Sequence, residues 1–185
     1  MKKLLSLFLS GAFLLSFSGA VTAQGMRESA NFAEDREAVA EEVSSFDLFW
    51  PIVAGRTRGD SLYFLKPLKE RLRELLIFND FQKAEYSITM AEKRAVELEK
   101  LVNERDLGNA QSTLEDAQAR WEQAGDRIKQ LSESGERVVD LQNRYLDSLE
   151  KQRRLFVFLR SDVEGEVRSL LESAVDLIDD ILSNE

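Results

Sequence analysis

The sequence predicts an all-α protein, an elongated antiparallel bundle of long heptad-patterned helices that follows an irregular, aromatic-rich N-terminal segment. The 185 residues include only 2 Pro and 9 Gly, the two residues that most disfavour helix interiors. Long stretches place apolar residues at alternating steps of three and four, as on one face of a helix. Short breaks marked by glycine or asparagine separate these stretches, and they favour chain reversal over the alternative of a parallel homo-oligomeric coiled coil.

Residues 1–23 have the pattern of a secretory signal peptide. Two lysines precede an apolar stretch that ends at Phe17, and Val21 and Ala23 occupy the two positions that a signal peptidase reads. Cleavage leaves Gln24 at the N-terminus of an extracytoplasmic chain, either periplasmic or secreted. An uncleaved N-terminal anchor is the alternative, and in that case this segment is the chain's one expected contact with a membrane.

Residues 24–66 are predicted to combine a short helix with an aromatic-rich connecting segment. A thin apolar stripe over residues 27–45 predicts an amphipathic helix. Residues 46–64 then carry five of the chain's aromatic side chains without helical spacing, which predicts an irregular connection.

Residues 67–185 are predicted to form the helical bundle domain. Pro67 suits the first turn of a helix that ends near residue 79, and the 3-4 stripes predict further helices over about 80–105 and 110–131. The last helical region spans 138–181, with a bend or a restart near 161–165, where Ser161 and Glu164 have the spacing of a capping box. The 3-4 phase continues through this bend and predicts that both halves keep one face in common.

Two stretches resemble the signatures of a known family. Residues 62–70 read Leu-Tyr-x-Leu-Lys-x-Leu-Lys-Glu, and the stretches 83–86 and 91–97 follow on the next helix. These motifs resemble those of a bacterial family filed as a domain of unknown function, over roughly residues 49–105, although the chain lacks a Pro after Ser61. The resemblance implies a helical, extracytoplasmic protein and carries over no activity, cofactor or catalytic residue.

The charged residues of the two motifs suggest surface ion pairs. We expect four bases in and just after the first motif to face solvent around a leucine stripe formed by Leu68, Leu72, Leu75 and Leu76. The acids Glu92 and Glu97 are expected to lie outside the apolar stripe of the next helix, where they can pair with such bases. Those bases are Lys66, Lys69, Arg71 and Arg73.

Composition excludes several classes of function. The absence of Cys and His removes thiolate chemistry, Cys-based metal sites and all nucleophile–histidine arrangements. A net charge of −9 disfavours nucleic-acid binding, which needs a cationic surface. No phosphate loop, nucleophile elbow or calcium loop occurs, so we expect no cofactor, no metal site and no enzymatic activity.

Residues 155–159 are the least explained part of the predicted bundle. Five consecutive apolar residues on a helix cannot all face one seam, so another segment must cover Val157 and Phe158. Packing of residues 46–64 over this turn is the favoured explanation, and it predicts a buried Trp50 indole. A partner chain or an exposed binding patch is the alternative. The candidate interaction patch comprises Phe49, Trp50, Arg56, Arg58, Tyr63, Phe64 and Phe158.

The predicted function is that of an extracytoplasmic, non-catalytic interaction or structural module of the cell envelope. Its partner is expected to be an unidentified envelope protein or a second copy of the chain, and not a nucleic acid. A periplasmic holdase-type chaperone is the first alternative, and an enzyme that uses carboxylates is the lesser one.

Overall fold

The computed structural model describes residues 43–184, all of which lie in the compact unit Ala40–Glu185. Within this range the chain forms helices and no strands, which confirms the predicted all-α class. The helices are α2 (Ser45–Phe49), α3 (Leu65–Leu75), α4 (Asp80–Asn103), α5 (Leu107–Glu133), α6 (Val139–Leu159) and α7 (Glu166–Ser183). The predicted signal segment and most of the amphipathic stretch over residues 27–45 lie outside the described residues.

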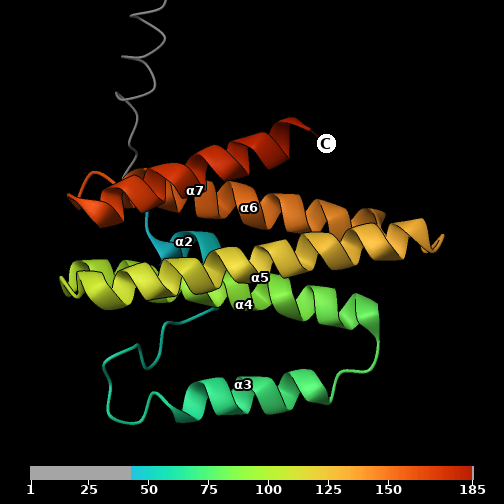
Figure 1. Cartoon of the computed structure of the whole chain (residues 1–185), viewed down its shortest axis with the longest axis horizontal. Helices are drawn as coiled ribbons and strands as arrows, with labels where there is room; N and C mark the ends of the chain where they lie inside the picture. Colours follow the sequence, from blue (N-terminus) through green and yellow to red (C-terminus); the bar gives the residue numbers. More distant parts are fainter. Residues whose placement is uncertain (1–42, 185) are drawn as a thin grey trace, which may run out of the picture. The chain divides into compact units, whose positions relative to one another are not determined.

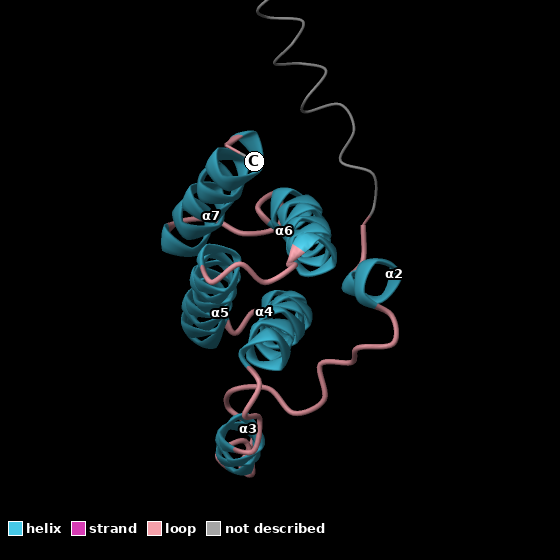
Figure 2. Cartoon of the chain, turned by 90° about the vertical axis from the view of Figure 1, so that its right-hand side faces the viewer, coloured by secondary structure: helices cyan, strands magenta, loops and turns pink. Residues whose placement is uncertain are grey.

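Helices α4, α5, α6 and α7 form an antiparallel bundle (Figure 1). Seen nearly end-on, α4 lies beside α5 and α6, and α7 lies beside α5 and α6 (Figure 2). Short connections over 104–106, 134–138 and 160–165 reverse the chain after each helix. The breaks read from the sequence are therefore chain reversals, as predicted.

The predicted apolar stripes of α4 and α5 form the core of this bundle. The seven residues at 3-4 spacing on α5 are all buried, and the corresponding seven on α4 are buried except Phe81, which packs against the core partly exposed. The stripe of α5 is Ala110, Leu114, Ala117, Trp121, Ala124, Ile128 and Leu131, and that of α4 is Phe81, Ala84, Ile88, Ala91, Ala95, Leu98 and Val102. Trp121 of α5 is fully buried, with its ring 6.1 Å from that of Phe156 on α6. Alanines recur along both stripes and allow the helix axes to approach closely. The buried alanines are Ala84, Ala91, Ala95, Ala110, Ala117 and Ala124.

Helix starts follow the capping chemistry of the sequence. The Asn79 side chain accepts a hydrogen bond from the backbone N–H of Gln82 at 3.1 Å and so caps the N-terminus of α4. Helix α5 begins earlier than predicted, directly after its N-cap Asp106, so Gly108 lies inside the helix. Helix α3 also begins early, at Leu65, and Pro67 remains within the first turn, where no backbone N–H is needed.

The predicted interruption near residues 161–165 is a restart and not a bend, because the chain reverses there between the separate helices α6 and α7. The capping box does not form, because Gly165 is the N-cap of α7 with φ of +68° and no side-chain bond, while the Ser161 hydroxyl donates to the Phe158 carbonyl at 2.6 Å. The predicted apolar phase holds along most of α7. Val167 and Ala174 are buried and Leu170 and Ile181 pack against the core, whereas Leu177 is exposed.

Residues 45–49 form a short helix where an irregular segment was predicted. Helix α2 packs on α4 and α6 (Figure 2), and Phe49 joins the core against which Val157 and Phe158 also pack. This contact agrees with internal cover of the 155–159 turn.

The prediction of a buried Trp50 is wrong. Trp50 is 67% exposed, and its ring lies 4.8 Å from that of Phe46. Residues four apart share a face of a helix, and α2 turns Ser45 and Phe49 inward. Phe46 and Trp50 therefore share a face that points to solvent.

Candidate functional site

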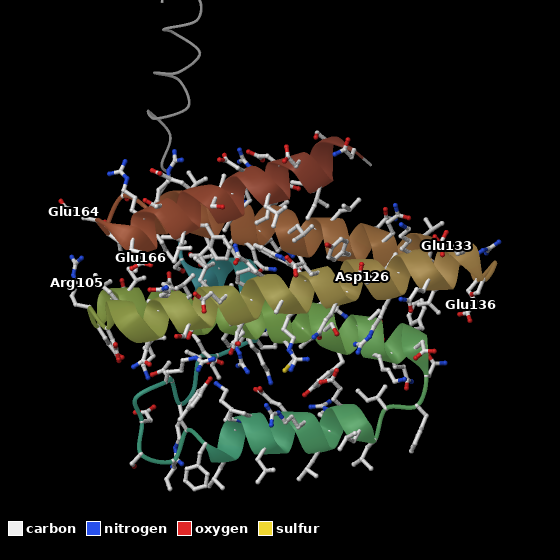
Figure 3. The ribbon with its side chains drawn as sticks, in the orientation of Figure 1. Arg105, Asp126, Glu133, Glu136, Glu164 and Glu166 are labelled. Carbon is white, nitrogen blue, oxygen red and sulfur yellow. The ribbon has the colours of Figure 1, made fainter. Side chains whose placement is uncertain are left out.

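Helix α3 lies outside the bundle and exposes its apolar side. Eight of the thirteen large apolar side chains that are exposed within residues 43–184 belong to the segment 62–78. Leu75 and Phe78 are 73% and 85% exposed. In Figure 3, apolar side chains project from the side of α3 that points away from α4, whereas charged side chains fill the space between the two helices. We call this surface the apolar face; it comprises Leu62, Phe64, Leu65, Leu68, Leu72, Leu75, Leu76 and Phe78.

The polar side of α3 packs on α4 through a buried charge cluster. Glu70 and Arg94 are 8% and 4% exposed, and their side chains form an ion pair at hydrogen-bonding distance. Arg94 Nη1 also donates to Glu97 Oε1 at 2.9 Å, and Glu97 is completely buried. The Tyr86 hydroxyl adds a hydrogen bond at 3.0 Å to the backbone carbonyl of Glu70. The family-like motifs on the two helices thus meet through their charges.

Lys66 connects this cluster to the preceding loop. Its ammonium pairs with Glu97 and donates to the carbonyls of Ala54 and Arg56, both at 2.9 Å. The expectation that Lys66 faces solvent is therefore wrong, because a buried carboxylate and two carbonyls surround its charge. The predicted pairing of Glu97 with a base of the first motif is confirmed. Glu92 also pairs with a base, but that base is Arg144 of α6, at 3.7 Å.

The α3–α4 charge cluster consists of three bases and three acids. Arg58 pairs with Asp116 of α5, whose carboxylate also lies 3.7 Å from Arg94 Nε. Its members are Arg58, Lys66, Glu70, Arg94, Glu97 and Asp116. Charges of this kind are costly to bury singly, but here each has at least one partner of opposite sign.

Burial has the largest effect on the pKa of Glu97, the acid at the centre of this cluster. Burial raises the pKa of Glu97, and Arg94 and Lys66 oppose that rise only in part. Glu97 Oε2 has no hydrogen-bond partner among the described residues, which is consistent with a costly charge. For Arg94, burial alone lowers the pKa, but Glu97 and Glu70 together hold the pKa of the guanidinium well above its usual value. Arg94 is therefore a fixed positive charge between two carboxylates.

A second ionic contact holds the C-terminal half of α3. Glu74 accepts from Arg120 at 3.0 Å and from Arg127 at 3.3 Å, both on α5. Burial alone raises the pKa of Glu74, but these hydrogen bonds outweigh it and lower the pKa below its usual value. Glu70 and Glu74, the two acids of α3, thus lie on its inner side, where each is paired with arginine.

The remaining bases of α3 flank the apolar face. At 100° per residue, Lys69 and Arg73 lie along one edge of the face and Arg71 lies along the other. All three are exposed, and none forms an ion pair within residues 43–184. We call these three residues the basic rim. The placement of these three bases around the leucine stripe agrees with the sequence prediction.

A shallow groove of about 360 Å³ adjoins one edge of the rim. Arg73, Lys93 and Arg144 line it, together with Glu85, which lies 3.9 Å from Arg144. Burial is the main cause that lowers the pKa of Lys93; Glu70 opposes this, and the nearby cations Lys66, Arg73 and Arg94 add to it. The groove beside the rim therefore carries three bases and one acid, although the chain as a whole is acidic.

The structure disperses the aromatic part of the candidate patch. Phe49 is buried in the core, and Phe158 packs against it, so neither contributes an open binding surface. Trp50 is exposed on α2, and Phe64 is exposed at the start of α3. These two exposed rings belong to different elements.

The two arginines of the candidate patch, Arg56 and Arg58, lie in the loop before α3. Arg58 pairs with Asp116 and lies 5.7 Å from the centre of the Tyr63 ring, so its charge is engaged internally. Arg56 is exposed. Asp60 accepts from the Thr57 amide at 2.8 Å, so the Arg-Gly-Asp tripeptide at 58–60 forms a turn held by its own chain.

Sequence reasoning did not identify the apolar face as a surface. The leucine stripe was evident from the spacing, but the spacing did not show that the opposite, charged side of α3 is the buried one. One signal was present: Arg94 and Glu97 lie three residues apart on α4, away from its apolar stripe, and Glu70 and Glu74 lie four apart on α3. Matched charges on two neighbouring helices indicate a polar contact between them.

The described residues contain no group of three acidic side chains arranged to hold a metal ion. None of the helices in the described range is long and apolar enough to cross a bilayer.

Together these features define an all-α domain in which a four-helix bundle holds an amphipathic helix with its apolar side outward. The chain belongs to the family described as a domain of unknown function, DUF5667, whose sequence profile matches residues 55–153. The matched range runs from the loop before α3 into α6 and includes the charge cluster and the apolar face. It confirms membership of a family of unknown function; it begins six residues later than the predicted range of 49–105 and extends further toward the C-terminus. No curated protein and no solved structure matches the chain.

Proposed function

We propose that this protein is a non-catalytic interaction module of the cell envelope, located outside the cytoplasm, whose contact surface is the apolar face of α3. The partner binds along the helix, and the bundle serves as the scaffold that presents it. The family match supports no more specific activity.

The outward orientation of α3 is the observation that carries this proposal. A surface helix of a globular protein ordinarily turns its apolar stripe toward the core. Here Glu70 and Glu74 are held against Arg94, Arg120 and Arg127, so the leucines face outward. An exposed apolar surface of this size is a liability unless a partner covers it. Because the charge cluster lies within the matched family range, we infer that presentation of this surface is the role of the fold.

The absence of Cys from the chain permits a direct test in cells. We would introduce Leu72→Cys on the apolar face and, separately, Val139→Cys as a matched exposed apolar position on α6. Intact cells are treated with a small membrane-impermeant maleimide, and labelling is compared with that of the purified variants. We expect the purified variants to be labelled equally. In cells, we expect Val139→Cys to be labelled and Leu72→Cys to be protected.

Two results would contradict the proposal. Equal labelling at both positions in cells shows that nothing covers the apolar face. Labelling of neither position before lysis places the chain inside the cytoplasm. The N-terminus supplies an independent check of location: mass spectrometry of the protein from its own cells should find Gln24 first, whereas an intact Met1 would indicate an anchored chain.

A holdase-type chaperone is the second candidate, because the apolar face is also a surface on which unfolded chains can bind. It predicts that the purified protein suppresses aggregation of an unrelated unfolded protein, and that Leu72→Glu abolishes this effect while Val139→Glu does not. An interaction module with one partner gives no such protection.

A further inference from the structure

We propose that the apolar face and basic rim of α3 bind the surface of an anionic phospholipid membrane. This inference rests on the proposed function, because it names the partner of the same surface. The helix would lie in the plane of the membrane, with its leucines at the boundary between headgroups and acyl chains.

The distribution of charge on α3 is the first argument. Helices that lie at a membrane surface carry Leu and Phe on one side and Lys or Arg beside them. Lys69, Arg71 and Arg73 provide the bases, while both acids of α3 are turned inward and paired. The outward side of α3 is therefore apolar and cationic within a chain of net charge −9. An anionic surface attracts this side of the protein and repels most of the others.

The shape of the surface is the second argument. The apolar face runs along a helix that stands out from the bundle (Figure 2), so it forms a ridge and not a pocket. Exposed Phe64 and Phe78 lie before and after the leucines, so apolar side chains extend over the whole segment. A ridge of this kind fits a deformable, flat surface along its entire length. It offers no enclosure for a small ligand.

The charges of the basic rim disfavour a second copy of the chain as the partner of the apolar face. Pairing two apolar faces about a twofold axis places the basic rim of one copy beside that of the other. The resulting repulsion opposes the gain from apolar burial. An anionic lipid surface has the opposite charge and meets the rim favourably.

The charge cluster also reduces the cost of binding. Many interfacial helices are unfolded in water and lose conformational entropy when they fold on the membrane. Helix α3 is already folded, and Glu70 and Glu74 fix its orientation on the bundle. A helix held in its bound conformation binds more tightly because this ordering has already taken place.

The experiment uses the full chain with the same N-terminus in every variant, so that any contribution of residues 1–23 is common to all. Vesicles of pure phosphatidylcholine are compared with vesicles that contain phosphatidylglycerol, and bound protein is measured by flotation. We expect binding to be stronger on the anionic vesicles. Leu72→Glu should weaken it at least about tenfold, and Lys69→Gln combined with Arg71→Gln should weaken it by about thirtyfold.

Val139→Glu is the matched control, because it adds the same charge at an exposed apolar position outside α3. Its binding should equal that of the unmodified chain. Circular dichroism melts should show that all variants remain folded. A polarity-sensitive dye on Leu72→Cys should brighten when anionic vesicles are added, while the same dye on Val139→Cys should not.

Four results would overturn the inference. Equal binding to neutral and anionic vesicles shows that anionic lipid is not recognised. Equal binding of Leu72→Glu and Val139→Glu removes the role of α3 in lipid binding. A dye at position 72 that is already in an apolar environment without vesicles shows that the chain itself covers the face. Crosslinking of position 72 to a protein, without dependence on phosphatidylglycerol, assigns the face to a protein partner. This last result refutes the lipid inference and leaves the proposed interaction module intact.

Discussion

Replacement of Arg94 by Met should release α3 from the bundle. Arg94 is 4% exposed and is paired with Glu70 and Glu97, so its removal leaves two buried carboxylates without their shared cation. Breaking a buried pair in this way typically costs about 3–5 kcal/mol. The protein can avoid most of that cost by detaching α3, because both acids then regain contact with water. The stability lost on this substitution therefore cannot exceed the free energy that holds α3 on the bundle.

This reasoning predicts a local effect and not global unfolding. The core of α4–α7 contains none of these charges, so its melting temperature should change little. Amide hydrogen exchange over residues 62–78 should accelerate by about 100-fold or more, corresponding to a loss of at least ~3 kcal/mol of local stability. Exchange in α5 and α7 should stay close to that of the unmodified chain.

Two further variants make the interpretation specific. Arg168→Met removes an exposed ion pair with Glu172 and should cost at most ~1 kcal/mol. Adding Glu70→Gln and Glu97→Gln to Arg94→Met removes the uncompensated charges and should restore part of the protection. If Arg94→Met exchanges over 62–78 like the unmodified chain, the charge cluster does not hold α3 in place and the account of its orientation fails.

The remaining predictions concern the core, the pH dependence and fluorescence. Ile88→Asp places a carboxylate in the bundle core and should cost at least ~3 kcal/mol in urea unfolding, whereas Glu92→Ala should cost far less; equal midpoints would refute the bundle assignment. Burial raises the folded-state pKa of Glu97 above the ordinary 4.5, so its contribution to stability is complete below pH 4.5 and is lost as the pH rises through the folded value. The melting temperature should accordingly fall less steeply between pH 4.5 and 8 for Glu97→Gln than for the unmodified chain. An unchanged slope would contradict the raised pKa of Glu97. Trp121 is buried and Trp50 is exposed, so Trp121→Phe should move the fluorescence emission to the red and Trp50→Phe should move it to the blue. The reverse shifts would contradict the burial assigned to the two indoles.

The bundle core was largely determined by sequence because its signals are local. The 3-4 spacing of α5 places seven residues on one face of a helix, and Asn79 marks the start of α4 through its capping side chain. Such signals fail where register depends on distant contacts. In α7 the adjacent leucines 170 and 171 both lie near the core, and the packing on α5 and α6 buries Leu171 fully and Leu170 only in part.

The candidate site shows the same division. The motif over residues 62–70 identified the family, and its charges indicated ion pairs with Glu97. The predicted patch, by contrast, grouped aromatic residues that the fold sends to different places. A run of aromatics without helical spacing does not show which ring a five-residue helix turns inward, and α2 buries Phe49 while it exposes Trp50.

The sequence by itself predicted an amphipathic helix from Pro67 to near residue 79, with leucines on one face and charged residues around them. Only the tertiary structure decided which face is buried. Periodicity records which side chains share a face, but the buried side depends on what the neighbouring helix offers. Helix α4 presents Arg94 and Glu97 away from the bundle core, and these charges gain more from Glu70 and Lys66 than from leucine. The polar side of α3 is therefore held inward, and its leucines are left for a partner.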